Sequence, residues 1–496
     1  MEGRDQPEGS LREEAKVRTQ SRVALPLNLE RVNAAAKQAA QTRFTALLHH
    51  VDEEALYRAF RRQKRQASAG VDGMTVAKYE EGLTDNIRDL WEPVHTDRYR
   101  PQPVRRVYIP KADGGKRPLG VPALEDKIVQ SAVAEVLSAV YEVDFLGFSY
   151  GFRPGRSPHM ALDALHTAIM SQRVNWVLDA DIRSFFDSVD HEWLLRMVAH
   201  RIADPRILRL IGLWLRAGVL ESGEKQETDR GTPQGAGISP LLANIFLHYI
   251  LDLWAHQWRR RHAYGRVVIV RYADDFVMGF EKKADAEEML LALKARLAGF
   301  GLTLHEDKTR LIEFGRFAAL SRQRRGERRP ETFAFLGFTH YCGRTRDGRF
   351  IVKHKTEGKR LTRKLTALRQ DAWRLMHAPM AAQHRWFAAV LRGQYGYYGR
   401  PHNYPALNGF HRQMRRIWLR CLRRRSQKSR RMGWSEFETL TARLSPCQLR
   451  ASLELGRRHG YDAGYPREEP GAGNPPARIC EGESRMAELL DHDRTS

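Results

Sequence analysis

The chain has 496 residues, with 83 Lys and Arg against 59 Asp and Glu, which gives a formal net charge of +24 and a pI of about 10.1. This length allows more than one buried core, and the charge makes a polyanion the expected partner. The mean hydropathy of −0.55, and the lack of any apolar run near the ~18–20 residues that cross a bilayer, argue against a membrane protein.

The cysteines and the start of the chain indicate the compartment. Cys342, Cys421, Cys447 and Cys480 are far apart and form no C-x-x-C pair, so neither a disulfide framework nor a zinc site is indicated. The first twenty residues are charged and lack the apolar core of a signal peptide. We therefore expect a reduced, cytoplasmic protein.

The order of sequence patterns predicts the organisation of the chain. The polar residues 1–25 predict a disordered tail. Apolar residues at helical spacing predict helices over 51–64 and 125–141, after which helical and strand patterns alternate. Beyond Gly343 the strand signals fade and helical spacing dominates, which predicts an all-helical region. Residues 460–496 open with Gly, Pro and charged residues, typical of a linker or of a tail ordered only on RNA.

Asp274 and Asp275 stand between the apolar runs 267–270 and 276–278, which predicts a tight β-hairpin carrying two acids at its turn. Ionised carboxylates this close raise each other's pKa unless a divalent cation neutralises them. Mg²⁺ is the natural occupant because it prefers oxygen ligands. Adjacent acids more often mark a solvated turn, but β-branched strands on both sides favour the metal interpretation.

A two-metal site for nucleotidyl transfer needs a further carboxylate from elsewhere in the chain. Period-2 alternation from Trp176 onward places Asp179 and Asp181 on one strand face, with Asp181 at the strand end. We predict Asp181 to be a metal ligand. Asp179, Asp187 and Asp190 are interpreted as surface or N-cap acids.

The most basic segment is 411–431, where ten of 21 residues are Lys or Arg and none is acidic. Its apolar residues recur at helical spacing, so one helix face can pack while the arginines project outward. A charge run is usually only a solvated face, but such faces generally mix signs, so this run favours phosphate binding. The predicted RNA-binding residues are Arg412, Arg415, Arg416, Arg423, Arg424, Arg425 and Lys428.

Three strings in order, at 180–187 (ADIRSFFD), 231–245 (GTPQGAGISPLLANI) and 272–275 (YADD), resemble the successive palm motifs of a reverse transcriptase. More narrowly, the chain resembles the reverse transcriptase and maturase encoded by bacterial group II introns. The resemblance covers roughly residues 41–446, through further strings at 42–44, 70–73, 108–111, 116–120, 148–157, 304–309, 335–338, 393–399 and 424–427. The last two strings resemble the maturase region, which distinguishes intron proteins from retroviral or telomeric relatives.

The resemblance implies an α+β, right-hand polymerase fold with fingers, a palm built on an antiparallel sheet, and an all-helical thumb. The expected boundaries are a disordered tail at 1–25, an N-terminal extension and fingers at 26–165, the palm at 166–345, the thumb or maturase domain at 346–459, and a C-terminal tail at 460–496.

By resemblance, Asp181, Asp274 and Asp275 would hold two Mg²⁺ ions, with a further oxygen from the backbone carbonyl of Ile182. The ions would lower the pKa of the primer 3′-hydroxyl and neutralise charge on the incoming triphosphate.

The same resemblance implies a nucleotide site made of Lys111, Arg117, Phe186, Gln234 and Lys308. The first two would clamp the triphosphate, although exposed cations on a hairpin are an alternative. Phe186 would collide with a ribose 2′-hydroxyl and so select dNTPs; without the family it reads as a core residue. Gln234 would line the pocket. Lys308 is either a general acid to pyrophosphate or a structural cation.

The implied function is RNA-directed DNA synthesis by a protein that binds its parent group II intron RNA, assists splicing and supports mobility by target-primed cDNA synthesis. Its partners would be intron RNA, an RNA template with a DNA primer, dNTPs and target DNA. Two alternatives remain: an RNA-binding maturase with incidental polymerase activity, and a domesticated enzyme of DNA repair or phage defence. Family members often carry an H-N-H endonuclease with paired cysteines, a spacing that the residues after Leu444 lack, so we expect the host to supply the second-strand primer.

Overall fold

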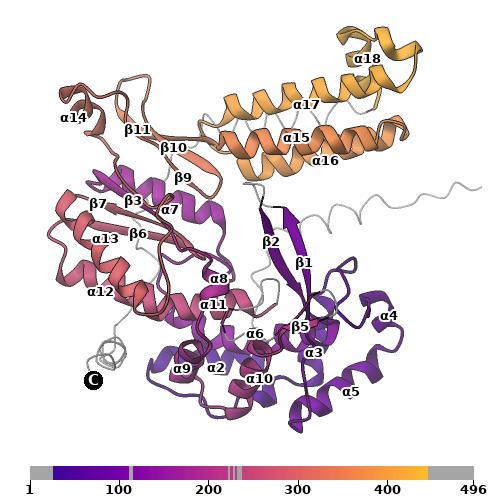
Figure 1. The fold of residues 1–496 in the computed structure, drawn as a ribbon, viewed down its shortest axis with the longest axis vertical. Helices are drawn as coiled ribbons and strands as arrows, with labels where there is room; N and C mark the ends of the chain where they lie inside the picture. The colour runs from indigo at the N-terminus through magenta and orange to yellow at the C-terminus, as the bar shows by residue number, and fades with distance from the viewer. Residues whose placement is uncertain (1–25, 111–114, 222–223, 227–229, 232–236, 445–496) are drawn as a thin grey trace, which may run out of the picture.

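A computed structural model of the chain describes residues 26–110, 115–221, 224–226, 230–231 and 237–444. The tails predicted at 1–25 and 460–496 lie outside these residues. The described residues combine helices with three sheets whose strand pairs are antiparallel except for one, which agrees with the predicted α+β class (Figure 1).

The N-terminal part is a helical base around one long helix. Its elements are α2 (Leu27–Gln38), a 3₁₀ turn (Leu48–His50), α3 (Glu53–Arg61), α4 (Val76–Glu80), α5 (Leu83–His95) and α6 (Leu124–Asp144). Asp52 caps α3, since its Oδ1 accepts from Ala55 N at 2.7 Å. α6 carries Ile128, Val129, Val133 and Val140 into the main core, and both α2 and α3 pack against it.

A narrow sheet rises from this base. β1 (Val104–Pro110) and β2 (Lys116–Val121) form an antiparallel hairpin, and β4 (Val219–Glu221) and β5 (Glu224–Gln226) complete the order β2-β1-β4-β5. Figure 1 shows the hairpin projecting from the base toward the C-terminal helices.

The central sheet has the order β6-β7-β3-β8, with every neighbouring pair antiparallel. Its strands are β3 (Trp176–Asp181), β6 (Val267–Tyr272), β7 (Asp275–Phe280) and β8 (Arg310–Glu313). One face joins α13 (Lys283–Ala298) in the main core, and the other packs against α7 (Pro158–Ser171) in a second core. This is the antiparallel sheet that the sequence predicts.

The described part of the chain between β3 and β6 contributes five α-helices to the main core. They are α8 (Phe185–Ser188), α9 (His191–Arg201), α10 (Pro205–Leu215), α11 (Ser239–Leu247) and α12 (Leu253–Arg261). A π-helical turn (His248–Asp252) joins α11 to α12, and its residues are buried. Such widened turns often occur near functional sites.

A second small sheet follows, with α14 (Ala318–Arg324) and the strands β9 (Phe333–Phe335), β10 (Phe338–Arg344) and β11 (Phe350–Thr356) in the order β11-β10-β9. β11 lies inside the region predicted to be all-helical from residue 346, so that prediction is wrong at its start. The strand escapes a sequence search because its inward positions include His354 and Thr356 rather than only aliphatic residues.

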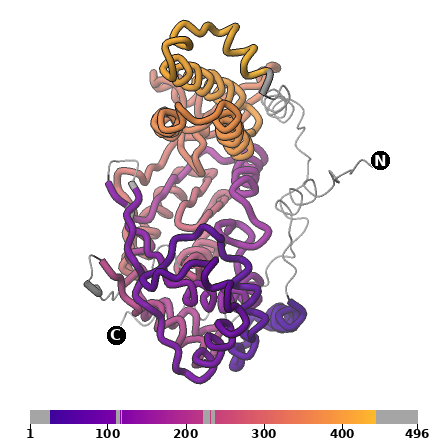
Figure 2. The backbone as a smooth tube through the Cα atoms, turned by 90° about the vertical axis from the view of Figure 1, so that its right-hand side faces the viewer, coloured from indigo at the N-terminus to yellow at the C-terminus, as the bar shows by residue number. Residues whose placement is uncertain are grey.

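The remaining described residues are helical, as predicted: α15 (Gly358–Arg374), α16 (Met380–Tyr398), α17 (Tyr404–Arg425), a 3₁₀ turn (Lys428–Arg431) and α18 (Trp434–Leu444). They form a separate core around Leu391, Phe410 and Trp418. Figures 1 and 2 show them at one end of the molecule, with the helical base at the other. Within the described residues, no helix is both long and apolar enough to cross a membrane.

Candidate active site

The acidic hairpin forms as the sequence predicts. β6 ends at Tyr272 and β7 begins at Asp275, and these two residues pair across the turn. The turn itself is Ala273-Asp274, with Ala273 at φ +57°. A positive φ is uncommon for alanine and is a conformation that surrounding structure must hold in place.

The structure brings two of the predicted metal ligands to adjacent strands. Asp181, the last residue of β3, lies directly opposite Asp275, the first of β7. Side chains opposite one another point to the same sheet face with Cβ atoms about 4.5–5.5 Å apart. Asp274 precedes Asp275 in the turn, so all three acids belong to one end of the central sheet.

Two neighbouring acids, Asp190 and Asp179, have different structural roles. Asp190 is the N-cap of α9 and accepts from Trp193 N at 3.0 Å, as predicted. Asp179 lies mid-strand and partly buried, 3.6 Å from Arg310, so its interpretation as a surface or N-cap acid is wrong. It adds negative charge to the face that carries Asp181.

This concentration of carboxylates shifts their titration. The pKa of Asp275 is raised to about 7, chiefly by burial and then by the negative charges of Asp179, Asp274 and Asp181, while Arg360 opposes the shift. Burial likewise raises the pKa of Asp179 to about 6, against the opposing effect of Arg310. Ionising these carboxyls is therefore unfavourable in the empty site, and a bound cation would favour their charged form.

The acids fit Mg²⁺ in donor type and charge. Among the described residues, no group of three or more His, Cys, Asp or Glu is already arranged as a ligand cage. Mg²⁺ usually binds through one or two carboxylates together with waters and substrate phosphates. A facing pair such as Asp181 and Asp275 therefore offers as many protein ligands as a magnesium ion usually has. The backbone carbonyl of Ile182, beside this pair, stays a predicted ligand.

Lys308 lies at the same carboxylates. Its Nζ donates to Asp181 Oδ2 at 2.6 Å, although the side chain is largely exposed. This contact pairs the Lys308 ammonium with one of the three predicted metal ligands. The role of Lys308 as a general acid stays a prediction.

The other nucleotide-site predictions are only partly covered by the structure. Lys111 and Gln234 lie outside the described residues. Arg117 pairs with Ile109 in the β1–β2 hairpin, but its side chain is outside the described part. Phe186 lies on α8, partly buried, with its ring 5.3 Å from that of Phe185.

Gly231, the last described residue before Gln234, lies beside α8. Its N donates to Val189 O at 2.8 Å, and a Cβ added to it would lie 3.0 Å from Phe186 O. Gly231 has φ +90°, which favours glycine there. Gly231 therefore contacts the backbone of the helix that carries Phe186.

The segment 148–153 supports the acidic turn, a role the sequence interpretation missed. Tyr150 N donates to Arg271 O at 2.8 Å, and Arg271 N donates to Phe148 O at 2.9 Å. A Cβ added to Gly151 would lie 2.2 Å from Ala273 N, so the two backbones touch. The available signal was Arg271 itself, a lone cation in an apolar strand.

The basic residues of the C-terminal helices are mostly exposed. Arg412, Arg416, Arg423, Arg424 and Lys428 are exposed, whereas Arg425 is partly buried. The sequence interpretation missed the exposed Arg420, although it follows Arg416 at i+4 spacing on the same face.

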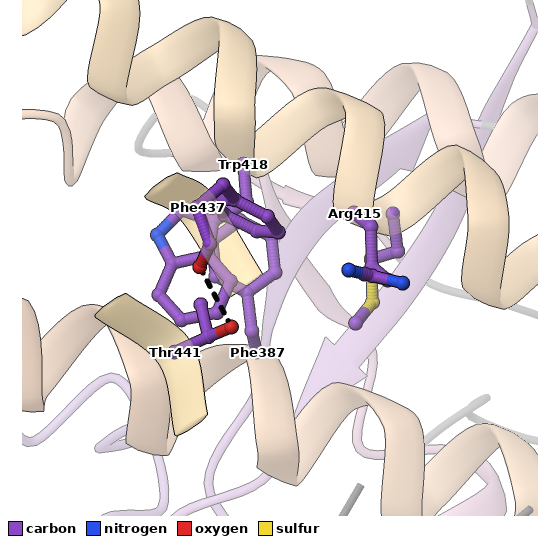
Figure 3. A pocket seen from close by; sticks show the side chains of 6 residues that line it. Phe387, Arg415, Trp418, Phe437 and Thr441 are labelled. Carbon is purple, nitrogen blue, oxygen red and sulfur yellow. Dashed lines mark hydrogen bonds between the residues drawn. The ribbon is translucent and has the colours of Figure 1, made fainter. Parts of the chain in front are cut away.

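Arg415 faces a neighbouring helix instead. It donates to Glu438 Oε1 at 2.7 Å and lies 5.4 Å from the Trp434 ring centre, so it packs α17 against α18. A cavity of about 20 Å³ adjoins it, lined by Phe387, Met414, Arg415, Trp418, Phe437 and Thr441 (Figure 3). This volume holds about one water molecule, which makes the cavity a packing gap rather than a substrate site.

Comparison with known proteins identifies the class. Residues 109–340 match the family described as "Reverse transcriptase (RNA-dependent DNA polymerase)". The matched residues contain the central sheet, both strands of the acidic hairpin and Asp181.

Named relatives narrow the class. Protein YkfC of Escherichia coli K12 is 35% identical over 273 residues, which cover 49% of this chain and 71% of that protein. The group II intron-encoded protein LtrA of Lactococcus lactis subsp. cremoris is 36% identical over 222 residues, 44% of this chain and 37% of LtrA. An uncharacterised 91 kDa protein in the cob intron of Schizosaccharomyces pombe is 38% identical over 180 residues, 36% of this chain and 21% of that protein. The chain belongs to the group II intron-type reverse transcriptases and maturases.

Proposed function

We propose that the protein is an RNA-directed DNA polymerase whose catalytic acids are Asp181, Asp274 and Asp275. The observation that carries the proposal is the direct opposition of Asp181 and Asp275 at the end of the central sheet, inside the region that matches reverse transcriptases. The raised pKa of Asp275 supports it, because a carboxyl whose pKa is shifted by burial and by neighbouring acids is typical of functional sites.

In this proposal Asp181, Asp274 and Asp275 would hold two Mg²⁺ ions, which would supply charge neutralisation to the reacting triphosphate. Asp181 and Asp275 orient the primer terminus relative to the triphosphate. Lys308 donates a proton as pyrophosphate leaves, a role that its hydrogen bond to Asp181 supports. Phe186, whose backbone oxygen lies beside Gly231, limits the space at the sugar and so favours dNTPs. Lys111, Arg117 and Gln234 complete the nucleotide site.

We also propose that the protein binds its parent intron RNA, assists its splicing and supports its mobility by target-primed cDNA synthesis. The similarity to LtrA, a group II intron-encoded protein, supports this role. The exposed cations of α17 support it as well, because they offer phosphate contacts on one helix face.

The test is the variant Asp274→Ala in the full-length protein. Losing ~4 kcal/mol of charge stabilisation corresponds to a rate decrease on the order of 10³-fold, so cDNA synthesis on a primed RNA template should be nearly abolished. Splicing of the intron RNA should persist, because the ribozyme supplies that chemistry.

Asp307→Ala is the matched control, since it removes an exposed carboxylate near Lys308 and should retain polymerase activity. Retained cDNA synthesis in Asp274→Ala would disprove the catalytic assignment. Loss of both activities would show that the residue is needed for folding.

A further inference from the structure

Arg271 is a fully buried cation directly behind the acidic turn. It is the penultimate residue of β6, and its side chain is 0% exposed. A buried charge is tolerated only when it is paired and its hydrogen-bonding groups are satisfied. The partners of this guanidinium therefore indicate what it holds together.

All five N–H donors of Arg271 have an acceptor. Asp252 receives a two-pronged contact, from Nε to Oδ1 at 2.7 Å and from Nη2 to Oδ2 at 2.5 Å. Nη2 also donates to Ser149 Oγ at 2.7 Å. Nη1 donates to Asn244 Oδ1 at 3.0 Å and to the backbone oxygen of Ala273 at 2.9 Å.

These partners come from separate segments. Ser149 belongs to the segment whose backbone touches the turn, Asn244 to α11, and Asp252 to the π-helical turn. Asn244 also donates from Nδ2 to Gly151 O at 2.7 Å, which closes the network around the turn. One rigid, planar side chain thus connects three supports to the Ala273 carbonyl.

Arg271 holds the acidic turn through its hydrogen bond to the Ala273 carbonyl. Ala273 has a positive φ, and Asp274 and Asp275 follow it directly. Fixing its peptide group fixes the direction in which the chain enters the two acids. The hydrogen bond from Arg271 Nη1 to the Ala273 oxygen therefore links the guanidinium to the backbone that carries the two acids.

We propose that Arg271, with Asp252 as its counter-charge, is a positioning residue that holds the Ala273-Asp274 turn in its metal-binding conformation. This inference rests on the proposed polymerase function, and it adds to the catalytic acids a residue that positions them. Lysine preserves the charge, but it has three donors on one nitrogen and does not span from Asp252 to the Ala273 oxygen.

The experiment compares full-length wild type with Arg271→Lys in two measurements. Mn²⁺ affinity, measured by electron paramagnetic resonance titration without nucleotide, should fall about 10-fold in the variant. The kcat of dNTP incorporation at saturating primer–template should fall about 100-fold, a size expected for misplaced catalytic groups.

The matched control is Arg201→Lys. Arg201 is also a buried arginine paired with a carboxylate, Asp144 at 3.1 Å, but it donates to the Ala39 and Ala40 carbonyls near the end of α2. It should lose thermal stability to a similar extent while keeping wild-type Mn²⁺ affinity per folded molecule. Equal loss of Mn²⁺ affinity in both lysine variants would overturn the inference.

Ser149→Ala keeps the test decisive if Arg271→Lys does not fold, because it removes one acceptor without unbalancing the buried charge. Its Mn²⁺ affinity should fall about 3-fold; an affinity equal to wild type in this variant, or in folded Arg271→Lys, would overturn the inference. If wild type itself neither binds Mn²⁺ nor extends a primer, the proposed function fails instead.

Discussion

At the scale of single residues, the acidic turn depends on the absence of a side chain as much as on the carboxylates. Gly151 has a φ that any residue adopts, so its constraint is space rather than conformation. A Cβ atom on residue 151 would lie only 2.2 Å from the backbone N atom of Ala273. Contact between two backbones cannot be relieved by rotating a side chain.

Gly151→Ala should therefore displace the turn and lower the rate of cDNA synthesis by about 100-fold, since a shift near 1 Å at reacting groups has an effect of this size. Primer-extension rates, with folding checked by circular dichroism, measure the effect. Gly147→Ala is the control, because an added Cβ there meets nothing within 4 Å. Equal activity in the two variants would show that the contact is not a constraint.

At the scale of elements, the β10–β11 pair brings histidines into a buried position. His340 stacks on Phe333 with ring centres 4.8 Å apart, and His354 lies 5.9 Å from His340. Burial, followed by the charges of His166 and Arg400, lowers the pKa of His340 to about 3. The pKa of His354 is lowered as well, first by burial and then by Arg400. These rings are neutral in the folded protein.

A lowered folded-state pKa stabilises the fold above the unfolded value near 6.5, and this contribution is lost as pH falls toward 3. Between pH 7.5 and 5, His340 alone should remove about 2 kcal/mol from the free energy of unfolding. His340→Phe keeps a ring for stacking and should reduce this acid sensitivity in urea titrations. The exposed His49→Phe should not; identical pH profiles for all three proteins would refute the assignment.

At the scale of the whole molecule, the positive charge is distributed unevenly. On α17, Arg412, Arg416 and Arg420 recur at i+4 spacing and are exposed, with no acid between them. Arg423 also has a packing role, because its Nε donates to Met432 O at 2.8 Å. Substitutions at Arg412, Arg416 and Arg420 therefore test phosphate binding with less effect on helix packing than substitutions at the predicted triplet 423–425.

Changing Arg412, Arg416 and Arg420 to Gln should weaken binding to group II intron RNA and reduce the salt slope of log K by about 2, as expected for three lost phosphate contacts. Filter-binding titrations at several salt concentrations measure both quantities. In the control variant, three exposed lysines on or next to α13 (Lys282, Lys283 and Lys294) are changed to Gln, which removes the same number of charges. Equal effects in both variants would mean that net charge, rather than the α17 face, governs binding.

The sequence by itself determined the features that depend on neighbouring residues. The acidic hairpin, the strand ending at Asp181, the N-cap at Asp190 and the helices after Gly358 follow from patterns within a few residues. The motif strings supplied the family, which the comparisons confirm. These features could be predicted because hydrophobic periodicity and turn preferences depend on short stretches of sequence.

Only the tertiary structure decided which distant residues meet. The register that sets Asp181 opposite Asp275, the Arg271 contacts with Ser149, Asn244 and Asp252, and the contact of Gly151 with Ala273 all join segments far apart in the chain. The strand β11 likewise exists through its pairing with β10. Such contacts depend on packing and hydrogen-bond satisfaction across the whole fold, which no local pattern specifies.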